Sequence, residues 1–224
     1  DGRPIARPLG LAYPEMGIHP NDVYLLGDNL LVAPVTERGK TSREVPFPSG
    51  KWVDFWNGQV HEGGGVETVD APLGTIPVFL KDNSFLPMLR PTIDAIAPTA
   101  FPDQIDSLGN AAGRLYVRFT SQSMIETSAD FTLFDGGAFH AEQSDDALFL
   151  DATISPEFQL GPQYEILAFG DAPTLVLANG QDVPEVASLD DLEAAGSGYY
   201  YTPESGGQLH IRVGPGNPTI QVNH

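Results

Sequence analysis

Glycine and proline interrupt this chain so often that no long helix can form in it. They account for 24 and 20 of the 224 positions, with no repeating period. Inside a helix glycine costs roughly 1 kcal/mol and proline roughly 3 kcal/mol relative to alanine, whereas both residues favour tight turns. Short runs of alternating apolar and polar residues lie between them, which is the pattern of strands with one face on a core. The sequence therefore predicts an all-β chain.

The clearest pair of strands runs from Lys51 to Glu62. Two alternating segments, KWVDFW and QVHE, flank Asn57-Gly58, the dipeptide best suited to the positive φ angles of a type I′ hairpin turn. We therefore expect a hairpin here, within one compact β unit. Further strands of this unit are expected at Leu30–Val35, Glu44–Phe47, Val66–Val69 and Ile76–Leu80.

A second β unit is expected in the C-terminal half. The alternating pattern fails over residues 91–113, which mix prolines and glycines without a sustained period and are interpreted as a linker. One short helix is expected, with Ser188 as its N-cap, Asp191 as the capping-box partner and Gly196 beyond its end. Strands are expected at Leu115–Phe119, Asp130–Phe134, Leu148–Ile154, Tyr164–Phe169, Thr174–Leu177, Leu209–Val213 and Thr219–Val222.

The expected domain organisation has four parts. Residues 1–20 fit neither β unit and are interpreted as the end of a preceding domain, because their one apolar stretch lies between prolines. Residues 21–90 form a first β-sandwich, 91–113 the linker and 114–224 a second β-sandwich. The chain starts with Asp1 rather than methionine, which suggests that it was cut or cloned from a longer protein.

The strong negative charge narrows the choice of partners. Eleven lysines and arginines stand against 30 acidic residues, a net charge of −19, so nucleic acid and anionic membrane surfaces would be repelled. No apolar run approaches the roughly 18 residues of a membrane span. Such acidity favours a secreted or periplasmic protein or one from a saline habitat, although it also fits a crowded cytosol.

No catalytic, cofactor-binding or metal-binding residues are predicted. The chain has no cysteine, and its five histidines lack the i, i+2 or i, i+4 spacing that places two ring nitrogens on one metal. No G-x-S-x-G elbow or phosphate-binding glycine loop occurs. The acidic pairs Asp145-Asp146 and Asp190-Asp191 are adjacent, so their side chains diverge and are expected on the solvated surface.

Aromatic residues offer the only candidates for ligand contact, here a sugar. Trp52 and Trp56 could form a stacking platform for pyranose rings, but strand alternation places both on one face, where core packing is the more favoured interpretation. In the run Tyr199-Tyr200-Tyr201 the side chains alternate, so at least one is expected to be exposed. Trp52, Trp56, Tyr199 and Tyr200 are therefore the candidate sugar-contact residues.

Several longer segments resemble a known family. They are RPIARPLGLAYPE, DVYLLGDNLLVAPVTERGKTSREVPFPSGKWVDFWNGQ and APLGTIPVFLKDNSFLPM. In order and spacing they resemble the region that follows the catalytic barrel in glycoside hydrolase family 31, the α-glucosidase and α-xylosidase family. The resemblance covers Gly2 to Met88. Beyond Leu115 it thins to FTLFDGGAF and VLANGQDVP, which are similar to a strand-and-turn and a late hairpin of the same family.

The resemblance implies a fold and a role. It implies two consecutive antiparallel β-sandwich domains, preceded by a remnant of the last strand of a (β/α)8 barrel at Arg7-Pro8-Leu9. The family's two catalytic aspartates lie on earlier barrel strands in motifs such as W-x-D-M-N-E, and no such motif occurs here, so no aspartate of this chain inherits that role. The parent would be a retaining α-glucosidase or α-xylosidase that needs no cofactor, and this piece would be inactive alone.

The implied partners are the parent's catalytic barrel and, through it, a carbohydrate substrate. The β-sandwiches would then support the barrel by packing on it. Two other interpretations stay open. One is a carbohydrate-binding β-sandwich module with no hydrolytic role, which the tryptophans and tyrosines suggest. The other is a standalone adhesion-type β-sandwich protein.

Overall fold

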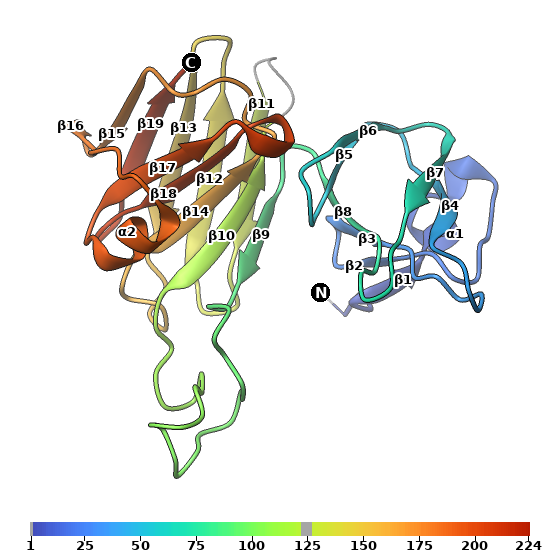
Figure 1. Ribbon diagram of the computed structural model, residues 1–224, viewed down its shortest axis with the longest axis horizontal. Coiled ribbons are helices and arrows are strands. Elements are labelled where there is room, and N and C mark those ends of the chain that lie inside the picture. Colours follow the sequence, from blue (N-terminus) through green and yellow to red (C-terminus); the bar gives the residue numbers. More distant parts are fainter. Residues whose placement is uncertain (1, 122–126) are drawn as a thin grey trace. The chain divides into compact units, whose positions relative to one another are not determined.

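The computed structural model describes residues 2–121 and 127–224 and confirms the all-β prediction (Figure 1). The chain divides into two compact units, Asp1–Ser84 and Phe85–His224. Each unit builds its own sheets around its own cluster of buried apolar side chains.

The first unit contains a six-stranded antiparallel sheet with strand order β1-β2-β3-β8-β5-β6, and a separate antiparallel pair, β4 and β7. Its strands are β1 (Ala6–Pro8), β2 (Tyr24–Leu26), β3 (Leu30–Val32), β4 (Ser42–Pro46), β5 (Lys51–Asp54), β6 (Val60–Glu62), β7 (Val66–Asp70) and β8 (Val78–Lys81). A short helix α1 (Leu9–Ala12) and a 3-10 turn η1 (Pro14–Met16) lie between β1 and β2. Phe47 and Phe79 meet edge to face in the core, with ring centroids 4.7 Å apart.

The expected hairpin from Lys51 to Glu62 is confirmed, but its turn is not type I′. β5 pairs antiparallel with β6, and the connection between them has a positive φ at Gly58 (72°) only, not at Asn57. The Asp54 carboxylate organises this turn, because its Oδ1 accepts hydrogen bonds from the backbone N–H groups of Trp56 (2.7 Å) and Asn57 (3.0 Å). A side-chain acceptor at the end of the strand therefore decides the turn geometry.

Residues 1–20 belong to the first unit, which corrects the expectation that they fit neither unit. β1 pairs antiparallel with β2, with Arg7 opposite Leu25. Leu9 is fully buried in the same core cluster as Leu25 and Trp52. The short apolar stretch thus completes the edge of this sheet and its core.

The second unit is a sandwich of two sheets. One has the order β17-β18-β14-β10-β9 and the other β11-β12-β13-β19-β15-β16. All pairs are antiparallel except β10–β14. The strands are β9 (Phe85–Met88), β10 (Leu115–Thr120), β11 (Thr127–Thr132), β12 (Ala138–Gln143), β13 (Ala147–Thr153), β14 (Pro162–Leu167), β15 (Leu175–Ala178), β16 (Gln181–Asp182), β17 (Gly198–Thr202), β18 (Gln208–Arg212) and β19 (Thr219–Asn223).

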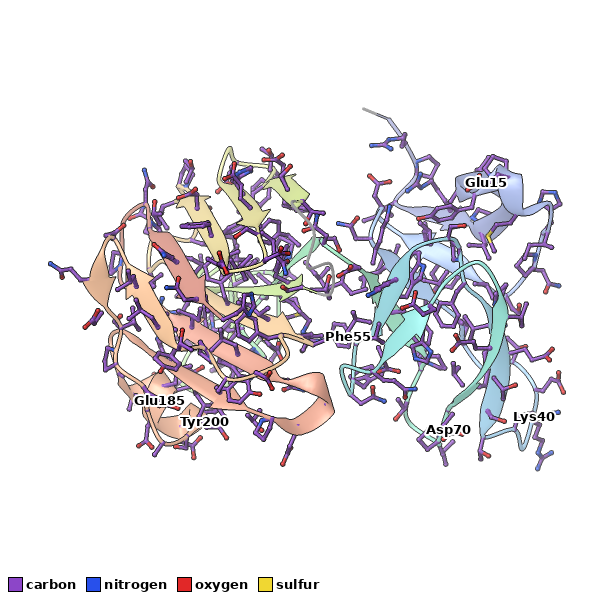
Figure 2. All side chains as sticks on the ribbon, turned by 90° about the horizontal axis from the view of Figure 1, so that it is seen from above. Glu15, Lys40, Phe55, Asp70, Glu185 and Tyr200 are labelled. Atoms are coloured by element: carbon purple, nitrogen blue, oxygen red, sulfur yellow. The ribbon has the colours of Figure 1, made fainter. Side chains whose placement is uncertain are left out.

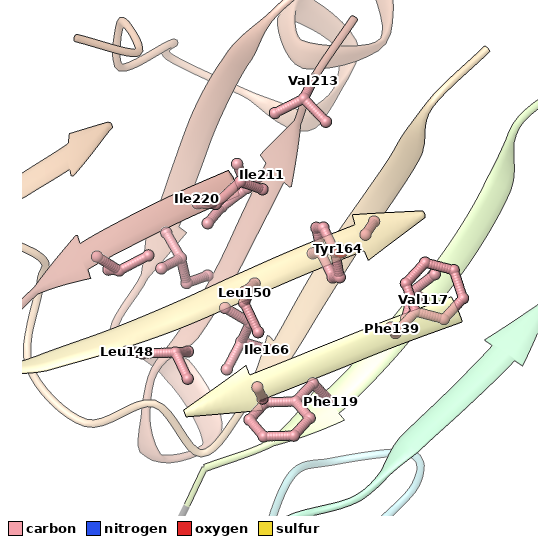
Figure 3. Close-up of a cluster of buried hydrophobic side chains, with 14 of the residues drawn as sticks. Val117, Phe119, Phe139, Leu148, Leu150, Tyr164, Ile166, Ile211, Val213 and Ile220 are labelled. Carbon is pink, nitrogen blue, oxygen red and sulfur yellow. The ribbon is translucent and has the colours of Figure 1, made fainter. Parts of the chain in front are cut away.

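Alternation along these strands fills the space between the sheets. Leu148 and Leu150 on β13 are fully buried, as are Tyr164 and Ile166 on β14 (Figure 3). Side chains two residues apart on a strand share a face, so each strand contributes every second residue to the core. The two sheets therefore hold one continuous apolar layer.

The segment expected to be a linker connects two strands of the second unit. β9 and β10 are hydrogen-bonded neighbours, and the connection 91–113 between them extends away from their sheet (Figure 1). Its two ends are tied together by Asp106, which accepts hydrogen bonds from Arg90 Nε (2.8 Å) and Thr92 Oγ1 (2.6 Å). The hydrogen bonds with Arg90 and then Thr92 lower the pKa of Asp106 to about 2. The division between the units falls earlier, after Ser84.

The expected helix is confirmed as α2 (Leu189–Ala194), capped by a hydrogen bond from Asp191 N–H to Ser188 Oγ (3.1 Å). Arg212 of β18 donates to the backbone carbonyls of Leu192 (3.1 Å) and Glu193 (2.7 Å). A cation at the carbonyl end of a helix is favoured by the helix dipole. The Glu193 carboxylate also accepts hydrogen bonds from Arg212 (2.8 Å) and from Tyr116 and Gln163. These contacts fasten α2 to the strands beside it.

Tyr164 offers a test of how the second core is built. Its side chain is fully buried, its hydroxyl has no hydrogen-bond partner, and burial raises its pKa. Because an unsatisfied buried hydroxyl costs about 1–3 kcal/mol, Tyr164→Phe should raise the free energy of unfolding by about 1 kcal/mol, measured by urea denaturation. In the control Tyr201→Phe, the lost hydroxyl donates to Gly170 O (2.7 Å), so stability should fall by about 0.5–1.5 kcal/mol. A larger loss for Tyr164→Phe than for Tyr201→Phe would contradict this account.

At low pH the connection 91–113 should lose the contacts that hold its two ends together. The pKa of Asp106 is lower in the folded state than its ordinary value of 3.8, so its stabilising effect is complete above pH 3.8 and is lost as the pH falls through about 2. Amide hydrogen exchange at Leu108, whose N–H donates to Ala95 O (3.0 Å), should then speed up after correction for intrinsic rates. Asp106→Asn should produce the same loss of protection at neutral pH, whereas the exposed Asp103→Asn should not. Equal protection in wild type and Asp106→Asn would show that the carboxylate does not hold this segment.

Candidate interaction surface

An arginine and an aspartate join the N-terminal segment to the turn between β2 and β3. Arg7 Nη2 donates to Gly27 O (2.7 Å) and to the Asp28 carboxylate, and Arg3 also lies 3.4 Å from Asp28. The Arg7 side chain is largely buried, whereas Asp28 is more than half exposed. A separation of 21 residues between Arg7 and Asp28 leaves no local sequence signal for this pair, and sequence reasoning missed it.

The first unit exposes many large apolar side chains for its size. Eight are exposed among its 84 residues, against six in the described part of the larger second unit. In the first unit these residues are Ile5, Leu11, Ile18, Leu26, Trp56, Val66, Leu73 and Ile76. Single exposed apolar side chains are normal on soluble proteins, whereas a large contiguous apolar patch marks an interaction site. Four of the eight come from the first 26 residues: Ile5 precedes β1, Leu11 lies in α1, Ile18 follows η1 and Leu26 ends β2.

Trp56 lies on the surface, which corrects the expectation that it shares a core face with Trp52. β5 ends at Asp54, so strand alternation does not reach Trp56, and 56% of this residue is exposed. Its Nε1 donates to Ile76 O (2.7 Å), and its ring meets Phe55 edge to face at 4.9 Å. The indole is therefore held in place while one side faces solvent, beside the loop that carries the exposed Ile76.

The other sugar-contact candidates are covered to different degrees. Trp52 is fully buried, as expected of a core residue, and its Nε1 donates to Pro48 O (3.0 Å). Tyr199, Tyr200 and Tyr201 on β17 are all half-buried (Tyr200 is labelled in Figure 2), so the expectation that at least one tyrosine of this run is exposed is wrong. Tyr199 packs against the core of the second unit, and Tyr200 lies 6.2 Å from His210. The four candidates divide between two units and form no common site within either.

The titratable groups of the described residues form no metal cluster. No group of three or more histidine, aspartate or glutamate side chains there could hold a metal ion. His61 Nδ1 is 2.7 Å from the Glu67 carboxylate. His140 lies between the carboxylates of Asp130 (2.8 Å) and Glu142 (3.3 Å). The hydrogen bond with Asp130, and to a smaller extent that with Glu142, raises the pKa of His140. The acidic pairs at 145–146 and 190–191 are exposed, as expected. Within the described ranges, no helix has the length and apolar character to cross a membrane.

Substitution of the two tryptophans should destabilise the first unit to very different extents. Trp52→Ala should lower the free energy of unfolding of the first unit by about 3–5 kcal/mol, because it leaves a large cavity. Trp56→Ala should cost about 1 kcal/mol or less, because the ring is mostly exposed and loses one hydrogen bond. Thermal unfolding followed by near-ultraviolet circular dichroism measures both. A Trp56→Ala variant as unstable as Trp52→Ala would place Trp56 in the core after all.

The sequence of this chain is similar to parts of known proteins. Residues 2–86 match the model of the glycosyl hydrolase family 31 C-terminal domain. Isomaltosyltransferase from Sporosarcina globispora is 29% identical over 204 residues, which is 89% of this chain and 18% of that protein. Alpha-glucosidase 2 from Bacillus thermoamyloliquefaciens is 38% identical over 105 residues, which is 46% of this chain and 13% of that protein.

A solved structure extends the likeness to both units. The cycloalternan-forming enzyme from Listeria monocytogenes, solved with a pentasaccharide substrate, superposes with a TM-score of 0.78 at 26% identity, over 99% of this chain and 21% of that one. The chain thus spans about a fifth or less of the length of these three proteins. The family resemblance seen in the sequence is therefore confirmed over residues 2–86, the part of the chain that matches the glycosyl hydrolase family 31 C-terminal domain.

Proposed function

We propose that this chain is the non-catalytic C-terminal part of a larger retaining glycoside hydrolase and supports that enzyme's catalytic barrel by packing on it. The observation that carries this proposal is the family match over residues 2–86, on a unit that exposes eight large apolar side chains. Two relatives are named an isomaltosyltransferase and an alpha-glucosidase, and a third, from Arabidopsis thaliana, is named alpha-xylosidase 1. These names support α-linked glucosides or xylosides as the parent's substrates.

A mechanism that retains the anomeric configuration depends on the exact positions of two carboxylates, which explains why the barrel would need support. One carboxylate attacks the anomeric carbon and another protonates the leaving oxygen and later activates water, and the two must stay about 5–5.5 Å apart. Small displacements of such groups lower the rate strongly. In the proposed enzyme the β-sandwiches brace the scaffold that holds these carboxylates, and the bond-breaking groups lie outside this chain.

The apolar N-terminal edge of the first unit is the surface we assign to the barrel. Ile5, Leu11 and Leu26 are 71%, 66% and 41% exposed. Full burial of an exposed leucine or isoleucine contributes about 1.5–3 kcal/mol, so each of these partly covered side chains would contribute less than that. The Arg7–Asp28 contact fixes the backbone that presents them. The proposed contact is therefore apolar, with a fixed shape.

The 224-residue chain should show no turnover of p-nitrophenyl α-glucoside or α-xyloside above background. The reason is that a retaining mechanism needs two convergent carboxylates, and the W-x-D-M-N-E motif expected to carry a catalytic aspartate does not occur in this sequence. A preparation from a host strain lacking its own α-glucosidases serves as the assay material. Turnover that co-purifies with the chain and survives this precaution would overturn the proposal.

A paired substitution tests the packing surface itself. In the longer protein, Leu11→Ser should lower the melting temperature of the catalytic activity, whereas in the 224-residue chain it should change stability by less than about 0.5 kcal/mol, because Leu11 is exposed there. Leu160→Ser, at a half-exposed leucine of the second unit, is the matched control and should have little effect in either. Equal effects of Leu11→Ser in both proteins would remove the N-terminal edge as the contact.

A further inference from the structure

The solvent face of the second unit's larger sheet carries an aromatic side chain that the core does not use. Leu148 and Leu150 of β13 point inward and are fully buried, so Phe149 between them points to the opposite face, where it is half-buried. Its direct cross-strand neighbours are Glu142 on β12 and Gln221 on β19. One face of the ring therefore lies among polar side chains rather than against another layer.

The polar groups around Phe149 hold one another in place. Glu142 lies 3.3 Å from His140 Nε2, and Gln221 Nε2 donates to Asn223 Oδ1 (2.9 Å). Each of these side chains keeps further hydrogen-bonding capacity, because a carboxylate has two acceptor oxygens and a side-chain amide has both donors and an acceptor. A flat ring with fixed carboxylate and amide groups on either side is an arrangement that can bind a ligand with both an apolar and a polar surface.

The surface is hollowed next to Phe149. The hollow has a volume of about 360 Å³, and Phe149, Glu142, Gln143 and Ser144 are among the residues that line it. This volume lies within the range of about 300–1,000 Å³ typical of small-molecule sites. The Gln143 side chain is 96% buried, since its relative exposure is 4%, and its Nε2 has no hydrogen-bond partner. Strand alternation turns this side chain to the inner face of the sheet, where its Oε1 accepts a hydrogen bond from Ser121 Oγ (2.9 Å), so Gln143 lines the hollow but offers it no side-chain donor.

Charge restricts the class of ligand. The six strands of this sheet contain no lysine or arginine, whereas Asp130, Glu142 and Asp151 lie on the same face as Phe149. An anionic ligand would therefore be repelled. A pyranose ring fits the arrangement, because its C–H face can stack on an aromatic ring and its hydroxyls can both donate to Glu142 and accept from the side-chain amides.

We propose that the hollow beside Phe149 binds a neutral oligosaccharide, with one pyranose ring stacked on Phe149 and its hydroxyls bonded to Glu142 and Gln221. The site lies entirely in the second unit, and it goes beyond the proposed supporting role, which assigns no ligand to this unit. It also differs from the tryptophan and tyrosine candidates, none of which lies on this sheet.

Titration of the isotope-labelled 224-residue chain with maltotriose and with isomaltotriose tests the site. Two-dimensional ¹H–¹⁵N spectra should show saturable shifts at the backbone amides of Phe149, Glu142 and Gln221 with at least one of the two sugars. Phe149→Ala should weaken that binding about tenfold or more, because it removes the stacking surface. Phe134→Ala is the matched control, since Phe134 is 87% exposed in the connection between β11 and β12, and it should leave the affinity unchanged.

A second variant keeps the test decisive if Phe149→Ala fails to fold. Glu142 is 69% exposed, so Glu142→Gln should fold normally and should weaken binding about threefold or more. The proposal is overturned by the absence of saturable shifts at tens of millimolar sugar, by shifts confined to other parts of the chain, or by wild-type affinity in Phe149→Ala or Glu142→Gln. Salt-sensitive binding of tetralysine at these amides without binding of either sugar would identify a cation-binding face and would equally overturn it.

Discussion

Alternation of side chains along short extended strands is the constraint on which both units depend. It places Leu148 and Leu150 in the second core and turns Phe149 toward solvent, and it places Trp52 in the first core. Because each strand is only a few residues long, the constraint ends where the strand ends. Beyond those points side-chain hydrogen bonds take over, as at Asp54, which directs the turn that carries Trp56 to the surface.

The difference between positions set by strand alternation and positions set by side-chain contacts explains which features could be predicted from the sequence. The all-β class, the Lys51–Glu62 hairpin and the Ser188-capped helix follow from local patterns, and all three are confirmed. The turn type at Asn57, the exposure of Trp56 and the course of residues 91–113 depend on non-local or side-chain contacts. In the last case the Arg90–Asp106 pair joins positions 16 residues apart, and the pairing of β9 with β10 across that connection has no local signal.

For the N-terminal residues, too, the sequence shows the local pattern but not the non-local contact. The apolar stretch near Leu9 is visible in the sequence, but its place in the first core depends on pairing between β1 and β2. In the same part of the first unit, Ile5, Leu11 and Leu26 are exposed to solvent. One local structure thus completes a core on its inner side and leaves apolar groups on its outer side, as we expect of a unit built to pack against a larger body. The sheet beside Phe149 presents a polar face instead, so the two units are suited to different partners.

We propose that this chain braces a catalytic region that it does not itself contain. The most direct measurement compares the melting temperature and kcat/KM of that upstream region alone with those of the longer protein that includes these 224 residues. We predict that the region alone melts several degrees lower and loses most of its kcat/KM at the growth temperature. An upstream region that keeps both its melting temperature and its full activity without this chain would contradict the account.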